Sequence, residues 1–183
     1  TVDLAQHIDR ASNLEFMVIM TYASGEQVPS FFDQVRDLIE KTGLPLHIIS
    51  AGGTGSQEFC QSIGCTETRI GSYIYEGMTR VGKREDLHPD RCPLRMVTTV
   101  VSNARPGQVI IDAGQKAFTS YPPNPYGYCL EHPEIFIRGM SVEHGHVDIT
   151  QSSHNFNVGD ILSFIPLHGG MTTNLHQQIH PVR

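Results

Sequence analysis

Residues 44–56 of the chain, LPLHIISAGGTGS, carry the pattern that decides the fold, an apolar run that ends in glycines. Residues 57–60, QEFC, follow this run and begin a helix. A buried strand that turns through glycines into a helix offers backbone N–H groups and the positive end of the helix dipole to an anion, most often a phosphate. We therefore predict that Gly52, Gly53 and Thr54 form a phosphate cradle.

An ordinary strand-to-helix turn is the alternative interpretation of this loop, because glycine also serves a turn through its backbone freedom. The loop has neither the lysine of a P-loop nor the six-residue motif that binds dinucleotides. Spacing within the loop alone favours the ordinary turn, so the position of the loop in the fold becomes the stronger argument.

The residues before the loop predict a β-α-β unit. Residues 14–22 are almost continuously apolar, as in a strand buried on both faces of a parallel sheet. Pro29 then opens a helix with apolar residues at helical spacing, and Gly43 is placed to end it. The glycine loop therefore follows a parallel strand at its carboxyl end, where α/β folds bind their ligands, and this strengthens the phosphate interpretation.

The residues after the loop change in character along the chain. Residues 66–75 predict another strand with Tyr73 and Tyr75 on one face, and the charged, proline-flanked residues 83–93 predict a domain junction. Short strand-like runs separated by Gly, Pro and Asn turns follow at residues 94–102, 108–112, 135–137, 142–149 and 161–166. This spacing predicts an antiparallel sheet or barrel. Residues 121–128, YPPNPYGY, predict a rigid loop that covers an active site or packs on this part.

Composition excludes several classes of protein. The 183 residues carry a formal net charge of −6, which argues against a nucleic-acid partner. No apolar run approaches the roughly 20 residues of a membrane span, and no secretory signal heads the chain. Four cysteines without a CxxC pair favour reduced thiols and a cytoplasmic location. Because the sequence starts without Met and in the middle of a helical pattern, we expect it to be a piece of a longer protein.

Five stretches in the same order resemble the fold-type III, pyridoxal-phosphate enzymes typified by D-threonine aldolase and eukaryotic-type D-serine dehydratase. The stretches are SAGGT (50–54), TETRIGSY (66–73), IIDAGQKA (110–117), EHG (143–145), and GDI (159–161) leading to IPLHGGMTTNL (165–175). The resemblance covers most of the chain from Leu14 onward. It implies the carboxyl-terminal part of a TIM-type β/α barrel in residues 1–80, followed in residues 94–183 by an antiparallel, β-rich, barrel-like domain. Family members are usually homodimers.

The same resemblance implies a set of site residues. The cofactor is pyridoxal phosphate, and the residues implied to bind it are Tyr22 near the ring and Ser50, Gly52, Gly53, Thr54 and Tyr73 at the phosphate. Glu143 and His144 are implied to line the substrate side of the site. His168 is implied to bind a divalent metal, zinc or manganese, that acts on the substrate hydroxyl.

The chain departs from the family pattern at two places. The Schiff-base lysine of the family lies near the start of the barrel, before anything present here, and none of the three lysines, Lys41, Lys83 and Lys116, matches it. We identify no catalytic residue, and for Lys116 a surface ion pair is the simpler interpretation. The second departure is Gly170. Family members have Cys or Asp two positions after the metal-binding histidine, and Gly170 occupies that position here. His176 and His180 complete a metal site only if the tail folds back.

A second metal site is conceivable from the residues alone. Seven of the ten histidines lie from His132 onward. On a strand, His144, His146 and Asp148 would share one face and chelate zinc or manganese, although alternating strand histidines are also common on solvated faces.

Three hypotheses about function follow. In the first, the intact protein is a pyridoxal-phosphate lyase of a β-hydroxy D-amino acid, by aldol cleavage of the D-threonine type or dehydration of the D-serine type. In the second, the chain is a non-catalytic homologue or one chain of a split enzyme, whose partner supplies the rest of the barrel. In the third, it is a metal-dependent enzyme without pyridoxal phosphate, built on His144, His146, Asp148 and His168.

Overall fold

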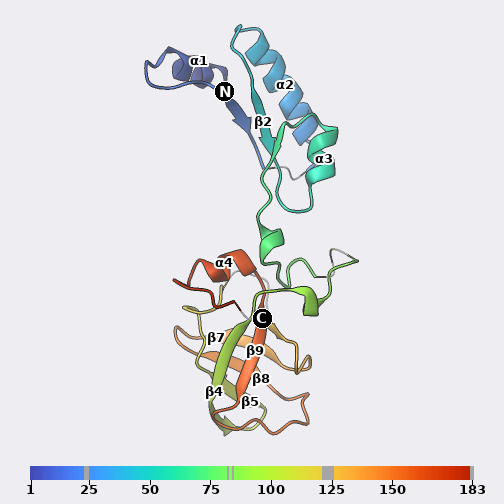
Figure 1. Cartoon of the computed structure of the whole chain (residues 1–183), viewed down its shortest axis with the longest axis vertical. Helices are drawn as coiled ribbons and strands as arrows, with labels where there is room; N and C mark the ends of the chain where they lie inside the picture. The colour runs from blue at the N-terminus through green and yellow to red at the C-terminus, as the bar shows by residue number, and fades with distance from the viewer. Residues whose placement is uncertain (23–24, 82, 84, 121–125, 182–183) are drawn as a thin grey trace. The chain divides into compact units, whose positions relative to one another are not determined.

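The computed structural model of the chain describes residues 1–22, 25–81, 83, 85–120 and 126–181 (Figure 1). These residues form two compact units, residues 1–73 and residues 74–183. The longest described helix has 13 residues, and no helix in the described part of the chain is long and apolar enough to cross a membrane. All four cysteines are free thiols.

The first unit is a three-stranded parallel sheet with helices, in strand order β1-β2-β3. Its elements are α1 (Val2–Arg10), β1 (Val18–Met20), α2 (Val28–Glu40), β2 (Ile48–Ala51), α3 (Gln57–Ser62) and β3 (Glu67–Thr68). The predicted β-α-β unit is confirmed, with Ile19 of β1 opposite Ile49 of β2. Gly43, just after α2, has a φ of +75°, which allows the helix to end there without strain.

One face of this sheet is buried and the other is open. Ile19, Ile49 and Ala51 point into a core that they share with Phe32 and Ile39 of α2. On the opposite face of β1, Val18 and Met20 are 42% and 65% exposed. The prediction of a strand buried on both faces at residues 14–22 is therefore wrong for this chain, because no described residue covers the second face.

The strand predicted at residues 66–75 is also mostly wrong. Only Glu67 and Thr68 pair with β2, because β2 ends at Ala51 and the chain beyond it turns away into the glycine loop. With no neighbouring strand left, the backbone after Thr68 forms a 3-10 turn, η1 (Ser72–Ile74). Tyr73 and Tyr75 therefore do not share the face of a strand.

The second unit is a closed, six-stranded antiparallel barrel in the order β4-β5-β8-β7-β6-β9 (Figure 1). Its elements are η2 (Pro89–Arg91), β4 (Met96–Arg105), β5 (Gln108–Ile111), β6 (Gly127–Cys129), β7 (Phe136–Met140), β8 (Gly145–Asp148), β9 (Ile161–Pro166) and α4 (Gly169–Thr173). All five predicted strand-like runs contain a strand. The sixth strand, β6, was missed because Gly127 and Tyr128 were predicted to belong to the proline-rich loop at residues 121–128, of which residues 121–125 lie outside the described residues.

The barrel is held by side chains that fill its interior. The fully buried core includes Val100, Val109, Ile137, Phe118 and Phe164. The rings of Phe118 and Phe164 meet edge to face, with centroids 6.1 Å apart and an interplanar angle of 88°. Closure removes the free strand edges that an open sheet would expose.

Asp112 connects β5 to β4 through its carboxylate. Its Oδ1 accepts hydrogen bonds from the Thr98 hydroxyl at 2.7 Å and from the Thr99 N–H at 2.8 Å. Burial raises the pKa of Asp112, but these hydrogen bonds to Thr99 and Thr98 outweigh it, and the pKa lies below its usual value.

We predict that Asp112→Asn lowers the free energy of unfolding at pH 7 and loses this effect in acid. Because the folded-state pKa is depressed, the ionised carboxylate stabilises the fold above its unfolded pKa of about 3.9, and this contribution disappears as the pH falls through the folded value. Urea unfolding of both proteins at pH 7 and at pH about 2.5 measures it. An equal difference at the two pH values would contradict the assignment.

Candidate functional site

The glycine loop follows β2 at the carboxyl edge of the sheet and packs against α3. Gly52 has a φ of +80°, and a Cβ at this position would lie 2.6 Å from both Cys60 Sγ and Ser56 Oγ. Only glycine therefore fits at residue 52. Gly53 differs, because the nearest atom to an added Cβ is the Arg69 carbonyl oxygen at 3.8 Å, so the loop is open at this residue.

Hydrogen bonds tie the loop to itself and to the segment after β3. The Ser56 hydroxyl accepts from the Gly53 N–H and donates to the Gly53 carbonyl, both at 2.9 Å. Thr54 Oγ1 accepts from the Gly71 N–H at 3.2 Å. The loop after β2 and the segment after β3 therefore form one surface at the carboxyl edge.

Arg69 crosses the ends of two strands at this edge. Its Nη1 donates to Ser50 Oγ at 2.6 Å, and its Nη2 donates to the Thr21 carbonyl at 2.9 Å. Ser50 is buried, and its hydroxyl in turn donates to the Glu67 carboxylate. The structure thus joins Ser50 to a guanidinium and a carboxylate, and it places Thr54 and Gly53 against the backbone of the same segment, at Gly71 and Arg69.

The sequence analysis missed Arg69 and Glu67 as members of this group. Both residues lie near the start of the strand predicted at residues 66–75, so the sequence did not indicate that they stand at a strand end; in the structure β3 ends at Thr68, and Arg69 follows it. Tyr22 and Tyr73 lie at the margins of the unit, where their side chains are mostly exposed. Their predicted contacts with a cofactor stay predictions.

The donors at the edge fit a phosphate group. A fixed guanidinium and the hydroxyl of Thr54 are groups that bind phosphate oxygens in proteins, and Gly53, whose N–H is bonded to Ser56, leaves space in the loop for a ligand. The negative charge of Glu67 repels an anion, but its carboxylate accepts a hydrogen bond from the Ser50 hydroxyl. Arg69 supplies the positive charge among these residues.

In the second unit, Glu143 and His144 belong to a turn that packs tightly against the loop after β5. A Cβ on Gly114 would lie 2.4 Å from both the His144 nitrogen and the Ser141 carbonyl oxygen. Lys116 Nζ lies 2.5 Å from Glu143 Oε1, and both side chains are largely exposed. Lys116 therefore forms the surface ion pair that the simpler interpretation predicted.

His168 is the N-cap residue of α4, and its Nδ1 accepts a hydrogen bond from the Met171 N–H at 3.2 Å. A Cβ on Gly170 would lie 3.6 Å from His168 Cε1, so a ligand side chain at residue 170 would stand beside the imidazole. His176 Nε2 lies instead 2.9 Å from the Ala117 carbonyl. No group of three metal ligands forms around His168 among the described residues, so these residues alone do not fit a divalent metal, which needs about three protein ligands.

The chelate predicted at His144, His146 and Asp148 is not assembled. β8 begins only at Gly145, His146 Nδ1 lies 3.3 Å from Gln108 Nε2, and Asp148 Oδ1 accepts from both donors of Thr150. These hydrogen bonds lower the pKa of Asp148. Among the described residues, no group of three or more His, Cys, Asp or Glu side chains could hold a metal ion.

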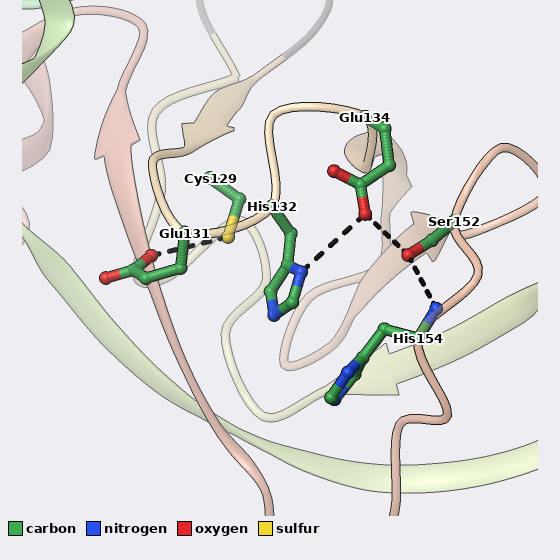
Figure 2. A network of polar contacts seen from close by, with 6 residues as sticks. All are labelled: Cys129, Glu131, His132, Glu134, Ser152 and His154. Carbon is green, nitrogen blue, oxygen red and sulfur yellow. Dashed lines mark hydrogen bonds and ion pairs between the residues drawn. The ribbon is translucent and has the colours of Figure 1, made fainter.

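Two further histidines, His132 and His154, pack against each other and against Phe156. The rings of His132 and His154 are 4.8 Å apart and both meet Phe156 edge to face. Figure 2 shows Glu134 between His132 and Ser152. The Glu134 carboxylate lies 3.6 Å from His132 Nδ1 and accepts a hydrogen bond from the Ser152 hydroxyl, which lowers the pKa of Glu134. Burial raises the pKa of the neighbouring Cys129 thiol to about 11, so this cysteine is not a nucleophile at neutral pH.

Comparison with known proteins identifies the family of the chain. Residues 93–182 match the serine dehydratase domain family. A D-threonine aldolase of an Arthrobacter species is 31% identical over 150 residues, which are 80% of this chain and 38% of the relative. A 3-hydroxy-D-aspartate aldolase of Paracoccus denitrificans (strain Pd 1222) is 32% identical over an alignment of 203 residues, covering 100% of this chain and 51% of the relative.

Solved structures show the same fold at lower identity. The crystal structure of D-threonine aldolase from Filomicrobium marinum superimposes with a TM-score of 0.71 at 21% identity, over 96% of this chain and 51% of that chain. D-threo-3-hydroxyaspartate dehydratase from Delftia sp. HT23 gives 0.66 at 21% identity, over 89% of this chain and 52% of that chain. The small parallel sheet followed by an antiparallel barrel is thus the architecture of roughly half of an alanine racemase-like enzyme.

The chain belongs to the fold-type III family of D-threonine aldolases, 3-hydroxy-D-aspartate aldolases and D-serine dehydratase-like enzymes. It spans about half the length of the curated relatives it matches, or less.

Proposed function

We propose that this chain provides the phosphate-binding side of a pyridoxal-phosphate-dependent lyase that cleaves a β-hydroxy D-amino acid. The observation that carries the proposal is the meeting of Thr54, Gly53 and Arg69 at the carboxyl edge of a parallel sheet. D-threonine and 3-hydroxy-D-aspartate, which the names of the relatives give, are both β-hydroxy D-amino acids. Aldol cleavage is the favoured reaction, and dehydration is the alternative.

Each residue at the edge has a distinct task in this proposal. Arg69 neutralises the phosphate charge, and its two bonds to Ser50 and to the Thr21 carbonyl fix the guanidinium before the ligand arrives. Thr54 and Gly53 accommodate phosphate oxygens where the loop is open. Ser50 binds the phosphate only by giving up its hydrogen bond to Glu67, so its main task here is to orient Arg69. When bound, pyridoxal phosphate supplies the electron sink for bond cleavage at the substrate Cα.

The Schiff-base lysine comes from outside the first unit in this proposal. The lysine of that unit, Lys41, is the C-cap residue of α2, which leads into the amino end of β2, opposite to the glycine loop. The uncovered face formed by Val18 and Met20 supports the presence of further barrel strands, from the rest of the polypeptide or from a second chain. Homodimer formation, as in the family, remains part of the proposal.

We predict that Arg69→Gln weakens the binding of pyridoxal phosphate by about tenfold to a hundredfold, because a hydrogen-bonded charge contributes about 1.5–3 kcal/mol. Calorimetric titration of the full chain measures it. Arg36→Gln is the matched control, because Arg36 lies on α2 and pairs with Asp33 at 3.4 Å. Arg69→Lys, which keeps the charge, is expected to recover part of the affinity. Equal affinity of the wild type and Arg69→Gln would refute the role of Arg69.

A second candidate function is cofactor-phosphate binding without catalysis, or service as one chain of a split enzyme. The placement of Lys41 at the opposite end of the β-α-β unit favours it, as does the ion pair of Lys116. Borohydride reduction in the presence of pyridoxal phosphate, followed by intact mass, separates the candidates. A stoichiometric adduct on one lysine of this chain would show that the chain supplies its own Schiff-base lysine, and it would contradict this second candidate function.

A further inference from the structure

A cavity lies in the barrel unit, and His176 is among the residues that line it. It has a volume of about 470 Å³ and lies among the start of β4, strand β9, helix α4 and the residues after α4. Val97 of β4 is paired with Ser163 of β9, and both residues line it. Its size falls within the range of about 300–1,000 Å³ that is usual for small-molecule sites.

The walls of the cavity are largely apolar. Leu94, Val97 and Ile179 contribute to them, and Val97 is 67% exposed although its side chain is apolar. Apolar surface gathered in a concave place loses its contact with water when a ligand with an apolar body enters. The cavity therefore favours an organic molecule over an inorganic ion.

The polar side chains of the cavity that can carry a charge are all basic. They are Arg95, His176 and His180, and none of the described residues that line the cavity is acidic. The Arg95 guanidinium donates to the backbone carbonyls of Leu94 at 3.2 Å and Asp90 at 3.3 Å, and also to that of Cys92. Carbonyl oxygens fix the guanidinium without cancelling its charge, so the charge remains available to an anion.

His176 has a fixed orientation in this wall. Its Nε2 lies 2.9 Å from the Ala117 carbonyl, which accepts hydrogen bonds only, so Nε2 carries the proton. This hydrogen bond anchors the residues after α4, which include Ile179 and His180, to the barrel unit. The cavity is thus bounded by a tail held in place on the barrel.

We infer that this cavity binds a small organic anion, a carboxylate carried on an aromatic or aliphatic body. Arg95 supplies the charge for the carboxylate, and Val97, Leu94 and Ile179 receive the body. The chain carries a formal net charge of −6, whereas the titratable side chains of this cavity are basic. The cavity therefore attracts anions, which the charge of the chain as a whole repels.

The test is binding of para-trifluoromethylbenzoate to the full chain, followed by fluorine NMR, with the neutral para-trifluoromethylbenzamide as the second probe. Val97→Glu puts a negative charge and a larger side chain into the cavity, and we expect it to weaken binding of the benzoate at least tenfold. Val158→Glu is the matched control, because Val158 is 60% exposed and does not line the cavity. His180→Gln is expected to weaken binding severalfold.

The supporting result is binding of the benzoate that exceeds that of the benzamide, is lost in Val97→Glu and persists in Val158→Glu. Equal binding of the two probes would overturn the choice of an anion. Absence of binding by the wild type, or equal loss in both glutamate variants, would overturn the site itself. The phosphate-binding residues of the first unit are unchanged in these variants, so failure here is separate from failure of the proposed function.

Discussion

Gly169→Ala is expected to lower the stability of the barrel unit by about 3 kcal/mol, at the upper end of what overpacking costs. The new Cβ would lie 2.4 Å from the Glu76 carbonyl oxygen and 2.9 Å from Tyr75 Cβ. Glu76 cannot move away easily, because it is buried, has a φ of +44° and lies 3.5 Å from Arg80 Nε through its carboxylate. The backbone just after Glu76 is also fixed, because the Met78 N–H donates to the Pro166 carbonyl of β9 and the Thr79 N–H donates to the Leu167 carbonyl.

Gly170→Ala is the matched control for this substitution. Its Cβ would make only ordinary contacts, the nearest at 3.6 Å from His168 Cε1, and alanine gains about 1 kcal/mol over glycine in a helix. Native-state hydrogen exchange of the β9 amides in the full chain reports the stability of the barrel directly. Similar protection in the two variants would contradict the close packing of Gly169 against the Glu76 backbone.

Phe164→Ala is the second substitution with a large expected effect, a loss of about 3–5 kcal/mol. Phe164 is fully buried on β9, where its ring meets that of Phe118 inside the barrel. Removal of the ring leaves a cavity that the closed barrel cannot collapse around, because β9 is paired on both sides, with β4 and β6.

Phe136→Ala is the control for this loss, since Phe136 is 39% exposed on β7. It is expected to cost about 1 kcal/mol or less. Urea unfolding of the full chain, followed through the NMR signals of the barrel amides, gives both values. A loss at residue 136 as large as the loss at residue 164 would mean that the core of the barrel is not where the structure places it.

Much of the architecture could be predicted because it depends on local periodicity. The apolar spacing in α2, with Pro29 and Gly43 at its ends, was enough to place one β-α-β unit. The barrel strands were recognisable by their length and by the turns between them. By contrast, the length of β3 is set by the point where its neighbour β2 ends. This depends on tertiary structure, and the alternating tyrosines Tyr73 and Tyr75 carry no information about it. The short β6 was hidden because Gly127 and Tyr128 fall in the predicted proline-rich loop, and because one of its two partners, β9, lies far along the chain.

The candidate site was predictable in part. Gly52 and Thr54 follow from the strand, loop and helix order, and the close packing around Gly52 explains the glycine. Arg69 was missed because a lone arginine in a strand-like run has many interpretations until its guanidinium is seen to bridge Ser50 and Thr21. The chelate of His144, His146 and Asp148 failed because the alternation of residue types gives a shared face only within one continuous strand, and β8 starts after His144.

Binding of a phosphate group at the edge formed by Gly53, Thr54 and Arg69 is the claim on which the proposed function depends. Nitrogen–proton correlation spectra of the full chain, titrated with pyridoxal phosphate and separately with pyridoxal, test it residue by residue. We expect pyridoxal phosphate to shift the amide signals of Gly53, Thr54 and Gly71, and pyridoxal at the same concentration to leave them in place. Shifts that are the same with both compounds, or amides at this edge that do not respond to pyridoxal phosphate, would contradict the assignment.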